Sequence, residues 1–247
     1  MRRKPKIRIW IIDKKTIIVS LFAIIFTILV MSKIALSNKI IPDKENKIKA
    51  KTILIDPGHG GIDGGANKGN ILEKNINLDI AIQVSSILKA NGANAILTRN
   101  KDISLDKLIN DGGSRYKRDL NARTNIINSS NADLFISIHA NCISGDTSEN
   151  GTMIFYRGKG SPSNKLADNI MSNIHNEFKS LNRNQHSPQI GDYYILRNAK
   201  IPGVIIETGF ISNESDCNLL LNSDFKNRIA EAICLGINDY FKGTASN

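Results

Sequence analysis

Cysteine is scarce in this sequence: the 247 residues include only Cys142, Cys217 and Cys234. None of them stands in the C-x-x-C spacing of zinc ribbons and redox motifs, which argues against both kinds of site. An odd number of cysteines also excludes a framework in which all are paired, so we expect the fold to depend on a hydrophobic core. Internal repeats and low-complexity tracts are likewise absent from the sequence.

Most of the chain has almost no excess of charge. Residues 1–50 contain twelve Lys or Arg and three Asp or Glu, whereas residues 51–247 contain 21 basic and 20 acidic side chains. The formal net charge of +10 therefore belongs almost entirely to the N-terminal segment. A domain that binds nucleic acid needs a basic surface for the phosphate backbone, and residues 51–247 have no basic excess to form one. We expect no nucleic-acid partner, and the same balance argues against a module that binds membrane surfaces through charge.

The basic charge precedes a segment that is apolar on all sides. Seven Lys or Arg lie between residues 2 and 15, and residues 16–32 form an uncharged run of 17 residues. With Lys33 at its border, residues 34–36 would extend this run to about 20 residues, the usual length of a membrane span. We predict a signal anchor or a cleaved signal peptide over residues 1–37. The positive-inside rule places everything after residue 37 outside the cytoplasm, either anchored in the membrane or secreted.

The remaining chain alternates short apolar runs with helical patterns. Residues 38–51 are rich in Lys, so we expect a polar stalk there, followed by a single domain over residues 52–243. Continuous apolar runs predict buried strands at residues 51–56, 95–98, 134–138, 152–156 and 204–206. Apolar side chains at helical spacing predict one helix that ends at residues 91–92 and others over residues 119–129, 163–178 and 224–241. This order predicts an α/β fold with a mixed, largely parallel sheet covered by helices on both faces.

Two of the four histidines follow predicted strands. His59 comes after residues 51–56 and His139 directly after residues 134–138, so we expect both imidazoles at the carboxyl-terminal edge of the sheet, where ligands gather in α/β proteins. Glu73 stands at the start of the first predicted helix and Glu207 ends the strand at residues 204–206, which places two carboxylates at the same edge. Glycines around His59 leave space beside its ring.

Two imidazoles and two carboxylates are the groups that a hydrolytic zinc site needs. Three of them would bind the metal and leave a position for water, and the fourth would act as general base and acid. The residues alone do not decide which glutamate has which role. The alternative is that each histidine is a structural residue with a hydrogen bond inside its own turn, but the matching positions of His59 and His139 favour the metal site.

Six segments, in this order, resemble motifs of the zinc-dependent N-acetylmuramoyl-L-alanine amidases (amidase type 3): residues 55–66, 73–78, 97–99, 120–123, 137–141 and 206–213. The resemblance extends over residues 52–241. It implies that His59, Glu73 and His139 bind Zn²⁺ and that Glu207 is the catalytic acid/base. It also implies hydrolysis of the amide between the lactyl group of N-acetylmuramic acid and L-alanine in peptidoglycan, and therefore a location in the cell wall.

The resemblance also concerns the neighbours of these residues. Asp63 and Asn141 lie next to the implied ligands and are weaker candidates for substrate binding or for support of the ligands; each could equally be a turn residue. Arg99 and Arg123 stand at family positions, where we expect buried ion pairs. Cys142 lies in the turn after the second histidine, but a thiolate would suit a closed structural zinc site better than an open hydrolytic one.

A short single-domain chain with a basic, apolar N-terminus is similar to the germination-specific amidases of spore-forming bacteria. That similarity implies removal of stem peptides in the spore cortex, which together with a separate deacetylase gives muramic δ-lactam. No wall-binding module is recognised in the chain, so we expect the membrane or a protein partner to supply localisation or activation. Two alternatives stay open: a zinc peptidase or deacylase that acts on another bond of peptidoglycan, and a non-catalytic wall-binding protein.

Overall fold

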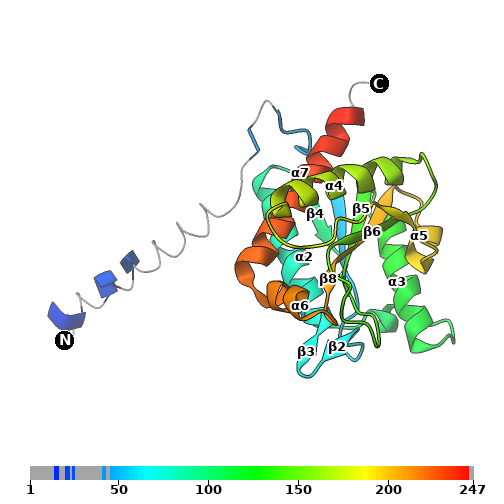
Figure 1. Ribbon diagram of the computed structural model, residues 1–247, viewed down its shortest axis with the longest axis horizontal. Helices are drawn as coiled ribbons and strands as arrows, with labels where there is room; N and C mark the ends of the chain where they lie inside the picture. The colour runs from blue at the N-terminus through cyan, green and yellow to red at the C-terminus, as the bar shows by residue number, and fades with distance from the viewer. Residues whose placement is uncertain (1–13, 17–19, 23, 26–40, 43–44, 245–247) are drawn as a thin grey trace, which may run out of the picture. The chain divides into compact units, whose positions relative to one another are not determined.

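The computed structural model describes residues 14–16, 20–22, 24–25, 41–42 and 45–244 (Figure 1). The chain divides into two units, residues 1–39 and 40–247. Most of the predicted signal segment, residues 1–37, lies outside the described residues, and those described within it are helical. Among the described residues, no helix has the length and hydropathy that a membrane crossing needs.

The second unit is built on a six-stranded sheet with the strand order β4-β1-β5-β8-β6-β7. Neighbouring strands are parallel except β6 and β8, which are antiparallel. Strands β1 and β8 are buried along almost their whole length, which explains why the sequence shows them as continuous apolar runs. The strand bounds are β1 (Thr52–Pro57), β4 (Asn94–Leu97), β5 (Leu134–Asn141), β6 (Met153–Tyr156), β7 (Gln189–Ile190) and β8 (Gly203–Phe210).

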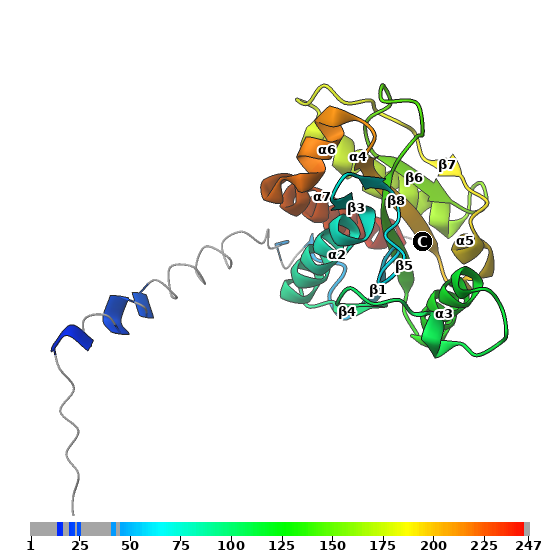
Figure 2. The ribbon, with the colours of Figure 1, turned by 90° about the horizontal axis from the view of Figure 1, so that it is seen from below.

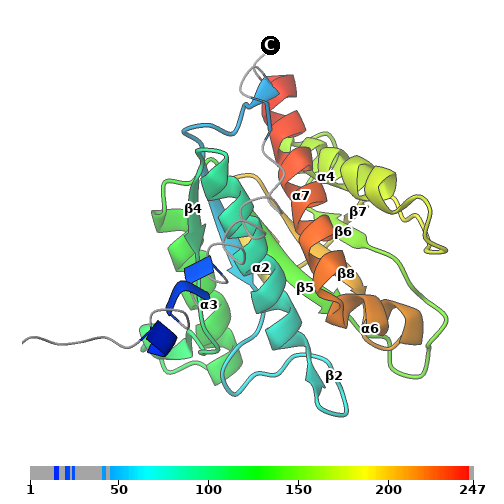
Figure 3. The same ribbon diagram turned by 90° about the vertical axis from the view of Figure 1, so that its left-hand side faces the viewer.

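Helices cover both faces of this sheet, as Figures 2 and 3 show. On one face lie α2 (Glu73–Ala90), α4 (Pro162–Phe178) and α7 (Ser223–Thr244), which enclose the larger core. On the other lie α3 (Arg115–Ser129) and α5 (Tyr194–Asn198), with a smaller core. Side chains alternate along β1, so Ile53 and Ile55 belong to the larger core and Leu54 to the smaller one. The predicted α/β fold, with a mixed, largely parallel sheet and helices on both faces, is confirmed.

The long elements agree with the prediction, whereas several short ones were not predicted. Helix α3 begins at Arg115 rather than at residue 119, because the Ser114 side chain accepts a hydrogen bond from the Lys117 amide and caps the helix. The other elements have too few residues for an apolar period to be recognised. They are β2 (Asn67–Lys68), β3 (Ile71–Leu72), η2 (Asp106–Leu108), α5, β7 and α6 (Glu214–Leu221).

Part of the segment predicted as a polar stalk belongs to the second unit and packs into its core. Ile41 and Ile48 are buried in the larger core. The Ile41 amide donates to the Asn91 side chain at the end of α2 at 2.7 Å, and the Lys47 amide donates to the Asn238 side chain of α7 at 2.7 Å. The lysines of this segment obscured its two buried isoleucines in the sequence pattern. The predicted domain limits, residues 52–243, stay a prediction.

Candidate active site

The candidate residues meet at the carboxyl-terminal edge of the parallel strands. His59 follows β1, His139 lies near the end of β5, and Glu207 of β8 pairs with His139 in the strand register. Glu73 is the first residue of α2. All four line one cavity of about 340 Å³. Three strands and the start of α2 thus bring together the two imidazoles and two carboxylates, as the sequence predicts.

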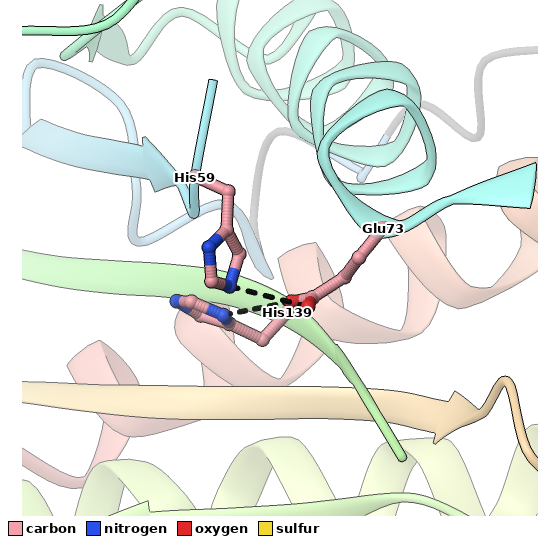
Figure 4. Close-up of side chains that lie close together, drawn as sticks. All are labelled: His59, Glu73 and His139. Atoms are coloured by element: carbon pink, nitrogen blue, oxygen red, sulfur yellow. Dashed lines mark hydrogen bonds and ion pairs between the residues drawn. The ribbon is translucent and has the colours of Figure 1, made fainter. Parts of the chain in front are cut away.

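Three of these side chains form a compact cluster, shown in Figure 4. Nε2 of His59 lies 3.1 Å from Oε2 of Glu73, and Nδ1 of His139 lies 3.0 Å from Oε1 of the same carboxylate. One possible ligand atom from each residue lies within 4.8 Å of the other two. Within the described part of the chain, no other group of His, Cys, Asp and Glu has this geometry. The cluster is a candidate metal centre with two imidazoles and one carboxylate.

Two glycines make room for this cluster. A Cβ atom at Gly58 would lie 2.1 Å from Cε1 of His139, and one at Gly65, where φ is +66°, would lie 2.4 Å from Oε2 of Glu73. His59 itself has a φ of 59°, a left-handed conformation that is strained for a residue with a side chain. The surrounding structure must therefore hold this turn in place.

Two buried arginines hold the turn through its carbonyl oxygens. Nη2 of Arg123 donates to the carbonyl of His59 at 2.6 Å, and Nη1 donates to that of Pro57 at 2.8 Å. Nε of Arg99 also donates to Pro57, at 3.0 Å, and its Nη2 donates to the carbonyl of Gly58 at 2.8 Å. Two guanidinium groups thereby fix three consecutive carbonyl oxygens, and one of these oxygens belongs to the strained His59.

Both ring nitrogens of His59 face carboxylates. Nδ1 lies 3.0 Å from Oδ2 of Asp63, while Nε2 faces Glu73. Burial lowers the pKa of His59, but the hydrogen bonds and negative charges of Glu73 and Asp63 outweigh it and raise the pKa to about 9. Burial raises the pKa of Glu73, yet the hydrogen bonds and positive charges of His139 and His59 hold it well below its usual range. Without a metal, Glu73 is ionised and His59 is protonated at neutral pH.

Glu207 has a different environment from Glu73. Its side chain is buried, with a relative exposure of 9%. Burial raises the pKa of Glu207 above its usual range. The charges of His139 and His59 lower this pKa and the charge of Glu73 raises it, which leaves it at about 7. A carboxyl group with a pKa near neutrality can both accept and release a proton at physiological pH, as a general base and acid must.

A family model described as N-acetylmuramoyl-L-alanine amidase matches residues 53–239. The chain belongs to this family. Its activity is that of an N-acetylmuramoyl-L-alanine amidase, a hydrolase that acts on peptidoglycan. The match covers nearly all of the second unit, including every residue of the three-residue cluster and Glu207.

Similar proteins support this assignment of the amidase. The germination-specific N-acetylmuramoyl-L-alanine amidase of Bacillus subtilis (strain 168) is 38% identical over 195 residues, which cover 78% of this chain and 81% of that protein. The CwlD amidase of Clostridioides difficile, solved in complex with the GerS lipoprotein, shows 36% identity and a TM-score of 0.72 over 78% of this chain and 99% of that one. An N-acetylmuramoyl-L-alanine amidase of Clostridium difficile 630 shows 28% identity and a TM-score of 0.69, over 78% and 98% of the two chains.

Asp63 and Asn141 both line the cavity of the amidase, in different ways. Asp63 contacts His59, whereas Oδ1 of Asn141 accepts a hydrogen bond from the Cys142 amide at 2.8 Å, as a turn residue does. Cys142 is exposed and lies outside the three-residue cluster. Substrate binding by Asp63 and Asn141 stays a prediction.

The prediction of buried ion pairs in the amidase is confirmed for Arg123 and wrong for Arg99. Arg123 lies 2.6 Å from a carboxylate oxygen of Asp56 and 2.7 Å from one of Asp119. Among the described residues, Arg99 instead donates its hydrogen bonds to backbone carbonyl oxygens. The difference arises because the carbonyls of the turn approach Arg99 more closely than any carboxylate does.

One wall of the amidase cavity was not predicted from the sequence. Tyr116, at the start of α3, and Tyr193 and Tyr194, at the start of α5, line the cavity together with the candidate residues. They lie outside the six motifs and belong to no long apolar period. A pair of tyrosines in a polar stretch was the available sign, and it does not specify a cavity.

Proposed function

We propose that His59, Glu73 and His139 bind a zinc ion and that Glu207 is the general base and acid of the amidase. The supporting observation is the convergence of three ligand-type side chains within 4.8 Å of one another, in the same cavity as a buried carboxyl group with a pKa of about 7. Two imidazoles and one carboxylate are a common ligand set for catalytic zinc. When bound, zinc would supply a Lewis acid that polarises the scissile carbonyl and makes water more acidic.

The residues present fit such an ion. Asp63 faces Nδ1 of His59 and leaves Nε2 directed to the cluster, which is the carboxylate–histidine arrangement found at zinc sites. The Glu73 carboxylate accepts hydrogen bonds from the Ala66 amide at 2.8 Å and from the Asn77 side chain at 3.0 Å. These supports belong to the protein itself, so the donor atoms are positioned before any metal binds.

Glu207 moves the protons in this proposal. Its carboxylate takes a proton from the attacking water, and the resulting carboxylic acid donates that proton to the nitrogen of L-alanine as the amide bond breaks. The new bond joins the water oxygen to the lactyl carbonyl carbon. The products are a glycan with a free lactyl carboxyl group and a peptide with a free N-terminal L-alanine.

Digestion of purified peptidoglycan tests these roles. The zinc-loaded full-length chain should release peptides that begin with L-alanine, identified by mass spectrometry. Glu207→Gln should bind zinc and release none, His139→Ala should lose zinc, and the exposed Glu214→Gln should behave as the unchanged protein. Cleavage of a different bond would identify a peptidase or deacylase. Zinc binding without any product would identify a wall-binding protein or a missing partner.

We infer that the amidase acts on the spore cortex. The support is its 38% identity to the germination-specific amidase of Bacillus subtilis over most of both chains. The chain should therefore restore muramic δ-lactam to the cortex of a B. subtilis strain that lacks its own germination-specific amidase, measured by mass spectrometry of cortex fragments. Cortex with intact stem peptides, despite production of an active amidase, would contradict this role.

We also propose that residues 1–37 carry the amidase across the cytoplasmic membrane, as an anchor or as a cleaved signal peptide. The support is the basic cluster before an uncharged run, and the fact that peptidoglycan lies outside that membrane. A chain that lacks residues 1–39 should stay inside the cell and be protected from added protease in intact protoplasts. Digestion of that chain by the protease would contradict the proposal.

A protein partner is proposed for localisation or activation. The support is that the CwlD amidase of C. difficile was solved in complex with a lipoprotein, GerS. Size-exclusion chromatography of this amidase mixed with GerS tests whether the two proteins bind each other, as CwlD and GerS do. A stable complex is expected, and separate elution of the two proteins would argue against the proposed partner.

A further inference from the structure

The cavity continues from the metal cluster onto the face of the sheet that α3 and α5 cover. Tyr116 and Leu120 of α3 line one side, Tyr193 and Ile195 line the other, and Ile205 of β8 forms part of the floor. Figures 1 and 2 show α3 and α5 side by side on this face. None of these five side chains has a role in the proton transfers described above.

Two of the three tyrosine side chains, those of Tyr193 and Tyr194, are held by their neighbours. The Tyr193 ring packs against Phe155 with ring centroids 5.1 Å apart, and a Cβ atom at Gly191 would lie 2.7 Å from that ring. The hydroxyl of Tyr194 donates to Oδ1 of Asn121 in α3 at 2.5 Å and so joins the two walls. The α5 side of the cavity is therefore preformed.

Tyr116 and Tyr193 are nevertheless accessible to solvent. Their relative exposures are 62% and 39%. Neither hydroxyl has a hydrogen-bond partner within the described part of the chain. Burial and the charge of Glu207 raise the pKa of Tyr193, so its hydroxyl stays a hydrogen-bond donor. Each ring offers an apolar surface with a polar tip, which suits a ligand that has both kinds of surface.

The charge of the cavity favours one end of the substrate over the other. Among the described residues that line it, five are acidic and Arg123 is the sole Lys or Arg. Arg123 is already paired with two of those acids. Even with a divalent cation bound, the cavity is negative, and it would repel the carboxylates of a stem peptide. The muramyl sugar is uncharged, because its carboxyl group is part of the scissile amide.

We propose that Tyr116 and Tyr193 form the subsite for the N-acetylmuramyl sugar, with the apolar face of the pyranose packed on the rings and its hydroxyl or acetamido groups bonded to the phenols. This inference rests on the proposed function, since the sugar must lie beside the scissile amide. It places the stem peptide on the opposite side of the metal cluster. Sugar binding, rather than peptide binding, then determines how tightly the substrate is held in this cavity.

The assignment is tested with two substrates, one that contains the sugar and one that lacks it. They are N-acetylmuramyl-L-alanyl-D-isoglutamine and its sugar-free analogue N-lactyl-L-alanyl-D-isoglutamine, hydrolysed by the zinc-loaded full-length chain. Tyr193→Leu and Tyr116→Leu should each lower kcat/KM for the first substrate about tenfold, through KM, and leave the second within about twofold. Tyr193→Phe, which keeps the ring, should retain most of the difference in kcat/KM between the two substrates. Leu221→Ala, an exposed residue outside the cavity, is the matched control.

A second measurement does not depend on catalysis. The ligand is N-acetylmuramic acid whose lactyl carboxyl group is converted to a primary amide. Saturation-transfer NMR should detect its binding to the metal-free chain, and the signal should fall in both Leu variants. If no substrate is cleaved but this signal behaves as expected, the subsite stands and the proposed function fails. An equal loss of kcat/KM for both substrates, or an unchanged NMR signal in the Leu variants, would overturn the sugar subsite.

Discussion

At the scale of single residues, the burial of Glu207 favours proton transfer at neutral pH but lowers the stability of the folded protein. Its carboxyl group is buried, so the ionised form lacks the hydration that it would have in the unfolded chain. The pKa of about 7 exceeds the ordinary glutamate value of 4.5, which means that the folded, metal-free protein binds this proton more tightly than the unfolded chain does. Stability therefore falls as the pH rises between these values, and the full cost is present above pH 7.

Replacement of Glu207 by Gln removes this cost along with the activity. For the metal-free protein, we expect the free energy of unfolding to rise by less than about 1 kcal/mol at pH 5 and by at most about 3 kcal/mol at pH 8. Urea unfolding at the two pH values measures the difference. A gain of equal size at both would show that ionisation of Glu207 is not its source.

His59 makes zinc uptake depend on pH. In the metal-free protein the pKa of His59 is about 9, so binding at pH 7.5 must displace a proton from its ring. We expect calorimetry in buffers of different ionisation enthalpy to report about one proton released per zinc, and the affinity to rise about tenfold per pH unit up to pH 9. Asp63→Asn removes one of the charges that raise this pKa, so the variant should release a smaller fraction of a proton. Uptake without proton release would contradict the protonated state of His59.

At the scale of elements, the turn between β1 and α2 depends on α3 and on the residues after β4. Arg123 and Arg99 reach the turn from those two places and fix the carbonyls of residues 57–59. Lysine at either position keeps the charge but cannot form the forked hydrogen bonds. We expect Arg123→Lys to weaken zinc binding about 10- to 100-fold, with a smaller loss for Arg99→Lys.

Competition with a chromophoric chelator measures these affinities, and circular dichroism shows whether each variant is folded. Arg157→Lys is the matched control, because Arg157 is exposed and donates to the carbonyl of Arg197, away from the turn. Unchanged zinc affinity in a folded Arg123→Lys variant would show that the turn keeps its geometry without this support.

The same scale shows what the sequence could predict. β1, β5 and β8 each begin with a mainly apolar run, and His59, His139 and Glu207 follow those runs in the sequence, so the position of the site followed from the rule that ligands gather at the carboxyl-terminal edge of parallel strands. α5 has only five residues, and its place beside α3 depends on contacts such as Tyr194 with Asn121. Those contacts join residues far apart in the chain, and no local pattern encodes them. The tyrosine wall was therefore not predictable.

At the scale of the whole molecule, the start of the folded unit differs from the start of its first strand. Residues 41–51 precede β1, yet Ile41 and Ile48 complete the larger core. Asn91 and Asn238 hold this segment through hydrogen bonds to and from its backbone. A chain cut at the first strand would lose two buried side chains and would leave both asparagines without these partners.

We therefore expect a chain of residues 40–247 to be more stable than one of residues 52–247. Burial of an isoleucine contributes about 1.5–3 kcal/mol, so the shorter chain should lose about 3–6 kcal/mol in its free energy of unfolding, measured with urea. Ile48→Ala in the longer chain separates packing from chain length and should cost about 2–5 kcal/mol. Equal stability of the two chains would mean that residues 41–51 contribute nothing to the core. The predicted loss would instead mean that inactivity of a 52–247 fragment says nothing about the chemistry of Glu207, because a smaller folded population lowers activity as well.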